Sequence, residues 1–375
     1  MGPDVQTHSL IPAVYIHVPF CLTKCGYCSF FSVPYKKSLA DEYFDYLCKE
    51  IDLFKQTYQI KPDSVYFGGG TPSLLNSKQI STIIDLLEPK ADAEITLEAN
   101  PVQITSEWLK AITQTKVNRL SLGVQSMHNN SLIALGRKHT AESMPERIKL
   151  CREFGFANLS LDLMYGCPDS TVAQVITELE LLLQLEPQHI STYLLSIDEN
   201  VPFKHWLPNI PDDAEAEKQY NTICETLVQA GFEHYELSNF AKTGFQSRHN
   251  LHYWLGDSYL GLGAGAAGFV DNVRYHKPDD LQLWEKTVMQ TDILNQTEIE
   301  TLAQQKADFI IMQLRLLRGL ELSEYQSRFG SDFASDFQEG LVRFTKSGHL
   351  RMEDGYVRLT RKALFVSNSI FREFV

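Results

Sequence analysis

Six short apolar runs, joined by longer amphipathic segments, constrain the fold of this chain more than any other feature of its sequence. The runs cover residues Ala13–His17, Ser64–Phe67, Glu94–Glu98, Arg119–Val124, Asn158–Leu163 and His189–Leu194. Between the runs lie helical patterns at 38–59, 77–88, 105–116, 128–155 and 171–186. The pattern at 128–155 is long enough for two helices. This alternation predicts parallel strands joined by right-handed helical crossovers, and therefore an α/β barrel or a doubly wound sheet.

Residues of ligand type recur where successive strands are expected to end, and this favours the barrel. Cysteines follow the first strand, Gly68–Pro72 follows the second, Glu98 and Asn100 end the third, Gln125 follows the fourth and Asp162 ends the fifth. The carboxyl ends of the strands of an α/β barrel converge on one mouth, where active sites are built. With six repeats we expect a partial (β/α)6 barrel that is open on one side.

After about Ile197 the regular alternation stops. We expect a helix near 214–230, a strand over Phe232–Leu237 and then a long loop. Further helical patterns follow at 298–317, 322–329 and 332–346. A short hairpin with Gly355 at its turn then completes a winged-helix-like α+β pattern. The expected units are therefore residues 1–197, 198–295 and 296–375.

The charge of the chain argues against a nucleic-acid partner. It carries 34 Lys or Arg against 47 Asp or Glu, a net charge of −13, and residues 298–375 hold 11 of each sign. DNA-binding domains present a basic face to the phosphates. We therefore interpret the winged-helix-like unit as a lid or packing module.

Three features predict a cytoplasmic protein. The segment before Cys21 has neither the basic region nor the long apolar region of a secretory signal. The run Tyr259–Val270 is too short and too rich in glycine to cross a bilayer. The thiols suit a reducing compartment. We expect a partner in the membrane to be met through protein contacts, because the acidic chain has no basic amphipathic stretch.

Cys21, Cys25 and Cys28 fall within eight residues, whereas the other four of the seven cysteines are scattered. A redox pair would use only two of the three, and structural zinc needs four ligands, for which no second cysteine pair follows. Chance clustering is disfavoured because free cysteines usually lie singly in cores. The remaining interpretation is an iron–sulfur cluster held by three thiolates, which leaves one iron of a four-iron cluster open to a small molecule.

The C-x3-C-x2-C spacing after the first strand of a partial barrel, with Tyr27 before the third cysteine, resembles the radical S-adenosylmethionine (SAM) superfamily. The resemblance implies a [4Fe–4S] cluster on Cys21, Cys25 and Cys28, whose open iron chelates the amino and carboxylate groups of SAM. It also implies a reductant for the cluster, since one electron cleaves SAM to a 5′-deoxyadenosyl radical. We expect His17 to support the cluster from behind its ligands.

Further motifs resemble the oxygen-independent coproporphyrinogen III oxidase family and its haem-chaperone branch, HemW. The blocks YIHVPFC, GGGTP, LEANP, RLSLGVQS, GRKH and LDLMYGCP occur in this order along the expected barrel. The resemblance implies SAM contacts from Tyr15, Gly69, Gly70, Thr71, Glu98, Gln125, Arg137 and Asp162. Taken singly, these residues have simpler interpretations, because a glycine run is by default a tight turn and a carboxylate at a strand end can cap a helix or pair with an arginine.

The two branches differ in two parts of the sequence. The oxidase pattern has a longer segment before the first strand and a fourth cysteine two residues after the third, where this chain has Phe30. The expected loop contains HNxxYW, the motif typical of the chaperones, and the resemblance implies haem binding by His249, Tyr253 and Trp254. An imidazole can ligate or contact the iron and the aromatic rings can pack on the macrocycle, although most single histidines in loops are solvated or hydrogen-bonded.

The resemblance favours a haem chaperone that binds a [4Fe–4S] cluster, SAM and haem and transfers haem to apo-haem proteins, among them respiratory enzymes. One alternative is the oxidase itself, which converts two propionates of coproporphyrinogen III to vinyl groups by radical decarboxylation. The other is a cluster-bearing electron carrier, which is disfavoured because a carrier normally caps all four irons with cysteine. Cys167 is expected near the barrel mouth or, as is commoner, in the core.

Overall fold

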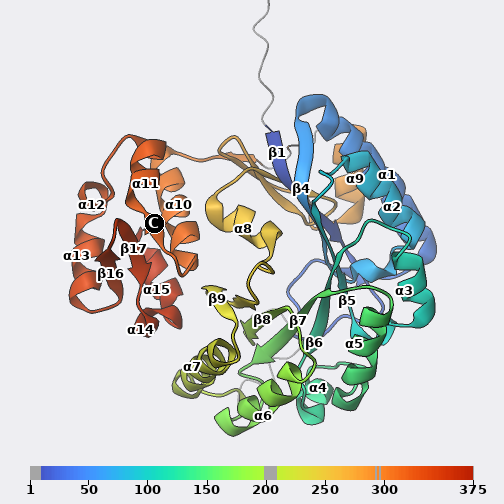
Figure 1. Ribbon diagram of the computed structural model, residues 1–375. Helices are drawn as coiled ribbons and strands as arrows, with labels where there is room; N and C mark the ends of the chain where they lie inside the picture. The colour runs from blue at the N-terminus through green and yellow to red at the C-terminus, as the bar shows by residue number, and fades with distance from the viewer. Residues whose placement is uncertain (1–9, 198–208, 292–293, 295–296, 375) are drawn as a thin grey trace, which may run out of the picture.

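The computed structural model describes residues 10–197, 209–291, 294 and 297–374, and its main feature is a twelve-stranded sheet. Six parallel strands form the centre of the sheet in chain order: β1 (Leu10–Val18), β4 (Gln59–Gly69), β5 (Glu94–Ala99), β6 (Arg119–Gln125), β7 (Asn158–Tyr165) and β8 (His189–Leu194). Each contains one of the six apolar runs. The sheet curves into an open barrel (Figure 1), so the expected partial barrel is confirmed.

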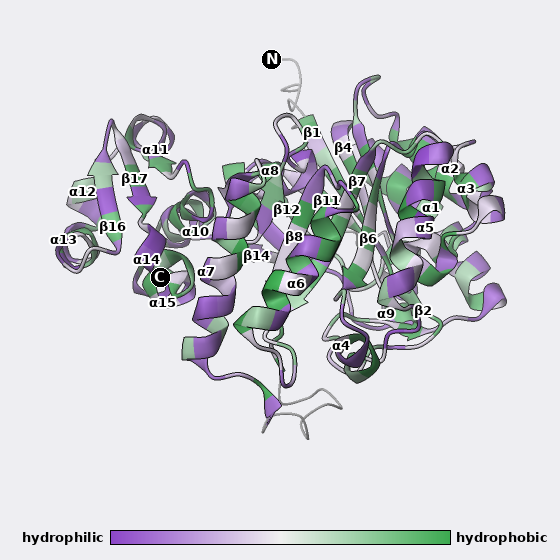
Figure 2. Ribbon diagram, turned by 60° about the horizontal axis from the view of Figure 1, so that its bottom comes forward, coloured by the Kyte–Doolittle hydropathy of each residue, from purple (hydrophilic) through white to green (hydrophobic). Residues whose placement is uncertain are grey.

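Six helices lie on the outer side of these strands (Figure 1). They are α1 (Lys37–Thr57), α2 (Ser77–Leu87), α3 (Ser106–Ile112), α4 (Asn129–Ala134), α5 (Met144–Glu153) and α6 (Val172–Leu183). The helix α2 shows why such a segment is helical. Asn76 and Gln79 form a capping box at its start, and a fully buried stripe of Ile80, Ile83 and Ile84 recurs at helical spacing. Figure 2 shows helices striped in apolar and polar residues.

A seventh parallel strand, β11 (Tyr259–Leu262), pairs with β1 on the side away from β4. Antiparallel strands continue the sheet beyond it: β12 (Ala267–Val270), β13 (Val273–His276) and β14 (Thr297–Ile299). The sequence analysis placed Tyr259–Leu262 in a long loop, and that expectation is wrong here. The strand β11 has only four residues and includes Gly261, where a Cβ would lie 1.9 Å from the Ala267 carbonyl oxygen. The segment is therefore hard to recognise as a strand from its own residues, and it is a strand only because it pairs with β1, far earlier in the chain.

A buried ion pair joins this edge of the sheet to α1. Lys277 Nζ lies 2.9 Å from Glu50 Oε1, and both side chains are 0% exposed. The Glu50 carboxylate also accepts hydrogen bonds from the Gly263 backbone N–H (2.7 Å) and from the indole N–H of Trp284 (3.2 Å) in α9 (Leu281–Met289). The buried carboxylate is thus surrounded by donors, as its desolvation requires.

At the other edge of the sheet, β10 (Asn239–Ala241) pairs antiparallel with β8, and β9 (Glu233–Glu236) pairs with β10. The helix α7 (Asp213–Gln229) precedes these two strands in the chain. The next segment, expected as a loop, is instead the helix α8 (Arg248–Leu255). Ser247 caps its first turn and Gly256 adopts a left-handed conformation at its end, which are typical helix boundaries. In Figure 1, α8 lies on the inner side of the curved sheet, between the sheet and the C-terminal helices.

The C-terminal unit is α+β, as expected. Its helices are α10 (Leu302–Arg315), α11 (Leu322–Phe329), α12 (Phe333–Asp336), α13 (Gln338–Lys346), α14 (Arg361–Leu364) and α15 (Ser367–Phe371). Its antiparallel sheet has the order β15 (Leu320–Glu321), β17 (Tyr356–Leu359), β16 (Leu350–Glu353). Asp354 and Gly355, both with positive φ, form the turn of the hairpin.

Short 3-10 turns complete the described elements: η1 (Pro72–Leu74), η2 (Pro101–Gln103), η3 (Ala141–Ser143) and η5 (Arg372–Phe374). Two expected unit boundaries fall next to or within segments outside the described residues, at 198–208 and 295–296. Within the described part of the chain, no helix is long and apolar enough to cross a bilayer.

Candidate functional site: a cysteine loop and a polar barrel interior

The strand β1 leads directly into the loop that carries Cys21, Cys25 and Cys28. A short parallel pair, β2 (Phe20–Cys21) and β3 (Val33–Pro34), closes the loop at its base. The three thiols are partly exposed and free of disulfides. The cysteines therefore lie on a closed loop at the carboxyl end of the first strand, as their spacing predicts.

The three thiols of the loop offer the ligand type of an iron–sulfur cluster. No three or more His, Cys, Asp or Glu side chains of the described residues are grouped so that they could hold one ion. A four-iron cluster takes one thiolate per iron, so its ligands need not converge on one point. Burial raises the pKa of the Cys28 thiol, and Cys25 and Cys21 add to the increase. Iron would favour the thiolates over the thiols, because a coordinating thiol is deprotonated by the charge of the metal.

His17 joins the far end of the cysteine loop to β1. Its ring is buried, and Nε2–H donates to the Phe31 carbonyl oxygen at 3.0 Å. Nδ1 is then left to accept from the Tyr15 hydroxyl at 3.1 Å. Since Phe31 follows Cys28 by three residues, this contact supports the loop from behind the cysteines.

A chain of polar contacts links two of the cysteines. Thr71 Oγ1 lies 3.7 Å from Cys21 Sγ, and Arg137 Nη1 lies 3.6 Å from Cys25 Sγ. Asn100 connects them, because its amide nitrogen donates to Thr71 Oγ1 (3.3 Å) and its Oδ1 accepts from Arg137 Nη2 (2.6 Å). A cavity of about 200 Å³ opens beside this chain. The structure thus brings two expected SAM contacts, Thr71 and Arg137, to the cysteines, and it adds Asn100.

Glu98 and Asp162 lie in the barrel interior. The Tyr66 hydroxyl donates to Glu98 Oε1 at 2.8 Å, and the Ser121 hydroxyl donates to Asp162 Oδ1 at 3.3 Å. Burial raises the pKa of Glu98 to about 7, and the charge of Asp162 adds to the increase. Burial also raises the pKa of Asp162 to about 6, against the opposing effect of Arg119. A cationic ligand would favour the ionised carboxylates.

The glycine run at the end of β4 has a packing reason. A Cβ at Gly69 would lie 2.7 Å from the His17 ring, and a Cβ at Gly70 would lie 2.7 Å from the Phe20 carbonyl oxygen. The glycines therefore allow β4 to approach the end of β1 closely. The Gly69 N–H also donates to the Glu98 carboxylate.

Gln125 ends β6 with a φ of +68°, a left-handed conformation that is uncommon for a residue with a side chain. A Cβ on the nearby Gly123 would lie 2.9 Å from Gln125 Nε2 and 3.1 Å from Arg137 Nη2, so the three residues are packed together. Arg137 Nη2 also donates to the Gly123 carbonyl oxygen at 2.6 Å. Backbone strain of this kind is concentrated at functional sites.

The helix α8 inserts His249 into the barrel. The imidazole is 1% exposed, Nδ1 lies 3.0 Å from the Ser64 hydroxyl, and Nε2 lies 2.7 Å from the Tyr253 hydroxyl. The ring also stacks on Tyr66, with centroids 5.1 Å apart. Burial lowers the pKa of His249 to about 3, so the ring is neutral near pH 7. In this arrangement His249 offers no free nitrogen to a haem iron, and ligation would require its hydrogen bond at one nitrogen to break.

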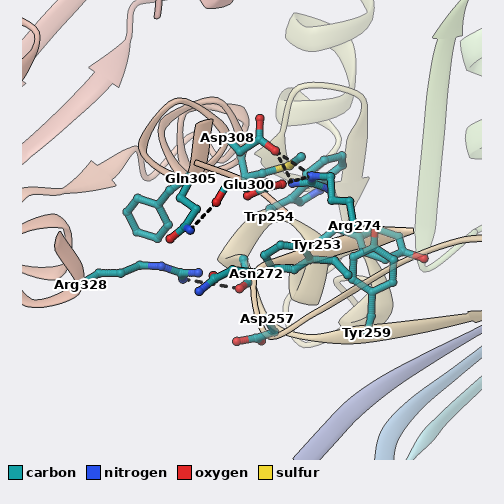
Figure 3. A pocket seen from close by; sticks show the side chains of 14 residues that line it. Tyr253, Trp254, Asp257, Tyr259, Asn272, Arg274, Glu300, Gln305, Asp308 and Arg328 are labelled. Carbon is teal, nitrogen blue, oxygen red and sulfur yellow. Dashed lines mark hydrogen bonds and ion pairs between the residues drawn. The ribbon is translucent and has the colours of Figure 1, made fainter. Parts of the chain in front are cut away.

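Tyr253 and Trp254 line a second cavity, of about 190 Å³, on the side of α8 that faces the C-terminal unit (Figure 3). Its other walls come from β11 to β13 and from α10 and α11, and they include Tyr259, Phe269, Arg274, Asp308, Phe309, Met312 and Arg328. Arg274 Nε donates to Asp308 at 2.8 Å across the cavity. The three expected haem residues therefore point in two directions, with His249 inside the barrel and the other two at the cavity.

Three further residues clarify what the sequence left open. Cys167 is a core residue, 2% exposed beside Leu195, and burial raises the pKa of its thiol to about 12. Asn100 was expected among the ligand-type residues of the barrel mouth but not as a SAM contact, and Tyr66 was not expected at the site at all. Tyr66 precedes Gly68 by two positions in the same strand, so it shares a face with the start of the glycine run.

Comparisons with known proteins agree with this arrangement. Residues 15–182 match the radical SAM superfamily, and residues 301–366 match the HemN C-terminal domain. The chain is 36% identical over 266 residues to the haem chaperone HemW of Escherichia coli strain K12, with 69% of this chain and 70% of that protein covered. It is 29% identical over 372 residues to HemW of Lactococcus lactis, with 97% of each chain covered.

The structure also resembles a solved one. Coproporphyrinogen III oxidase (HemN) from Escherichia coli, described as a radical SAM enzyme, matches with a TM-score of 0.85 at 22% identity. The match covers 98% of this chain and 90% of that chain. At this identity the similarity shows a common fold.

Proposed function

The chain belongs to the HemW family of radical SAM proteins, and from that premise we propose that it is a haem chaperone, which binds haem and transfers it to apo-haem proteins. The observation that carries the proposal is the 36% identity to HemW over 70% of that protein's length. Phe30, at 62% exposed, stands where the oxidase pattern has a fourth cysteine and supports the same choice. The similarity to the oxidase structure supports only the fold.

The radical SAM family binds a [4Fe–4S] cluster and SAM, and the residues of the cysteine loop and the barrel interior fit both. We propose that Cys21, Cys25 and Cys28 hold the cluster, which when bound supplies one electron for the reductive cleavage of SAM. The remaining residues position SAM, and the proposed contacts are Tyr15, Gly69, Gly70, Thr71, Glu98, Gln125, Arg137 and Asp162.

The charges of the barrel interior explain how these residues would act. Arg137, held by Asn100, lies at the cavity beside Cys25 and can pair with the SAM carboxylate. Glu98 and Asp162 can accept hydrogen bonds from the ribose hydroxyls and offset the positive charge of the sulfonium. The Tyr66 hydroxyl and the Gly69 N–H orient the Glu98 carboxylate for that task.

For haem, we propose that Tyr253 and Trp254 contact the macrocycle and that His249 holds Tyr253 from behind. The cavity they line is about 190 Å³, below the range of roughly 300–1,000 Å³ that is usual for ligand sites. It would therefore accept an edge of the macrocycle and leave the rest accessible, which suits transfer to an acceptor. The proposed partners are apo-haem proteins, including respiratory enzymes, and a reductant; the proposed location is the cytoplasm.

One anaerobic experiment tests the proposed function. The cluster is reconstituted, haem binding is followed by the haem absorption band, and transfer to an apo-haem protein and decarboxylation of coproporphyrinogen III are assayed side by side. We expect haem binding and transfer without decarboxylation. Turnover of coproporphyrinogen III would instead support the oxidase, and absence of both haem binding and SAM cleavage would support the electron carrier.

Single substitutions test the proposed cluster site and the proposed haem site separately. Cys25→Ser is expected to abolish the cluster and leave haem binding intact. Trp254→Ala is expected to weaken haem binding, whereas Trp108→Ala, which alters a tryptophan of α3 remote from α8, serves as its matched control. Equal haem affinity in both tryptophan variants would refute the proposed haem contact.

A further inference from the structure

A line of four side chains runs from Glu98, a proposed contact of SAM, to the helix α8, which carries the proposed haem contacts. The Tyr66 hydroxyl donates to Glu98 Oε1 at 2.8 Å. The Tyr66 ring stacks on His249 at a centroid distance of 5.1 Å and an angle of 28°. His249 Nε2 lies 2.7 Å from the hydroxyl of Tyr253, which lines the second cavity. Each of the three contacts is direct.

Neighbouring side chains confine this line. The Tyr15 ring lies 6.2 Å from the Tyr66 ring and 6.3 Å from the His249 ring. The Ser64 hydroxyl lies 3.0 Å from the remaining ring nitrogen of His249. A close-packed interior of this kind has few alternative arrangements, so one ring can shift only if its neighbour shifts as well. Contiguous networks with discrete arrangements are the physical carriers of coupling between sites.

Glu98, the first residue of this line, can be ionised or protonated. When Glu98 is ionised, its hydrogen bond from Tyr66 is charge-assisted and stronger than the bond to a protonated carboxyl group. SAM bound at this site would favour the ionised state through its sulfonium charge, and its ribose hydroxyls would compete with Tyr66 for the carboxylate oxygens. Occupancy of the SAM site would therefore change the hydrogen bond that helps to hold the Tyr66 ring against His249.

We propose that Tyr66 and His249 are positioning residues that couple occupancy of the SAM site to the haem-contacting side of α8. The inference rests on the proposed function, because it takes SAM and haem as the two ligands. Coupling of binding is reciprocal, so SAM and haem must change each other's affinity by the same factor. Couplings of this kind are typically about 5- to 150-fold.

The central test measures both affinities in the cluster-reconstituted protein. The haem dissociation constant is determined from the absorption band with and without SAM, and the SAM dissociation constant by calorimetry with and without haem. We expect each ligand to change the affinity of the other by about 5-fold or more. Tyr66→Phe removes only the hydroxyl that reaches Glu98 and is expected to reduce the mutual effect below about 2-fold while haem alone still binds. Tyr165→Phe, a buried tyrosine of β7 outside the line, should keep the full effect.

A second measurement does not require haem. The charged and titratable groups that face Glu98 from the surrounding elements are Tyr15, Tyr66, Arg119, Asp162, Tyr193 and Tyr253. Among them Tyr66 favours the ionised carboxylate through its hydrogen bond. In Tyr66→Phe the pH midpoint of SAM binding should therefore rise, and His249→Gln, which removes the stacked ring but retains hydrogen-bonding groups, should shift it in the same direction. Tyr165→Phe should leave the midpoint unchanged.

The outcomes separate this inference from the proposed function. If wild-type protein binds both ligands independently, or if the coupling survives in Tyr66→Phe, the coupling is refuted and the chaperone function stands. If wild-type protein binds no haem at all, the proposed function fails and the coupling fails with it. If Tyr66→Phe does not fold, loss of coupling in a folded His249→Gln protein supports the inference, and full coupling in that protein overturns it.

Discussion

His249→Ala should destabilise the protein even when neither SAM nor haem is present. The side chain is buried in the barrel, where it bridges the Ser64 hydroxyl of β4 and the Tyr253 hydroxyl of α8. Alanine would remove both hydrogen bonds and the ring that stacks on Tyr66. A histidine whose main task is to ligate iron at a surface would have no such effect on the ligand-free protein.

The expected loss of stability follows from these contacts. A buried polar group that loses its partner costs about 1–3 kcal/mol, and two hydroxyls are affected. The lower part of that range is appropriate, because Tyr253 borders a cavity that water can enter. The missing ring adds about 1–2 kcal/mol through lost packing. The free energy of unfolding should therefore fall by about 3–5 kcal/mol, a large fraction of the roughly 5–15 kcal/mol of a typical domain.

Thermal unfolding of the cluster-reconstituted protein without SAM and haem measures this change. At about 2 °C per kcal/mol for a chain of this size, the unfolding midpoint should fall by about 6–10 °C. His276→Ala is the matched control, because His276 lies on β13 with its side chain 48% exposed, and surface changes usually stay within about 0.5 kcal/mol. Midpoints that agree within about 1 °C for the two variants would show that His249 is not a buried bridge and would refute the reasoning.

Three further predictions concern buried groups that can ionise. Lys277→Met leaves the Glu50 carboxylate buried without its cation and should lower the free energy of unfolding by about 3–5 kcal/mol, measured from the urea midpoint. Burial lowers the pKa of His249 to about 3 and of His234 to about 4, below the usual value of about 6.5, so stability should be full above pH 6.5 and fall by about 2 kcal/mol per histidine at pH 5, because the unfolded chain takes up the protons. In His234→Gln the free energy of unfolding should fall less steeply below pH 6.5 than in the wild-type protein, which checks the direction of this effect. Because burial raises the pKa of Glu98 to about 7, SAM affinity should rise between pH 6 and pH 8 as the carboxylate ionises. Calorimetry on Glu98→Gln should show a smaller rise, which is left to Asp162 with its pKa of about 6.

The central strands could be predicted because their signal is local. Each of the six apolar runs became a parallel strand in the expected order, since a strand buried on both faces requires a continuous apolar stretch whatever its neighbours are. The strand β11 was missed for the opposite reason. Its four residues include Gly261, which fits against the Ala267 carbonyl oxygen only once β12 folds back over it, so the segment carries little strand pattern of its own.

The site was predictable where one short motif supplies it. The cysteine spacing predicts a closed loop at the end of β1, and the strand-end carboxylates Glu98 and Asp162 predict a polar barrel interior. The direction of His249 was not predictable in the same way. The motif marks a set of aromatic and imidazole side chains, but only the placement of α8 inside the curved sheet decides that His249 points at Tyr66 while Trp254 points at the second cavity.

The sequence by itself determined the order of the parallel strands, the cysteine loop and the family, because each depends on residues that are adjacent in the chain or recur at a regular spacing. Only the tertiary structure decided that the helix α8 lies inside the barrel and that one line of contacts joins Glu98 to Tyr253 through Tyr66 and His249. These residues come from three segments of the chain, β4, β5 and α8. Their contacts depend on which side chains the closed fold buries together, and no local pattern specifies that.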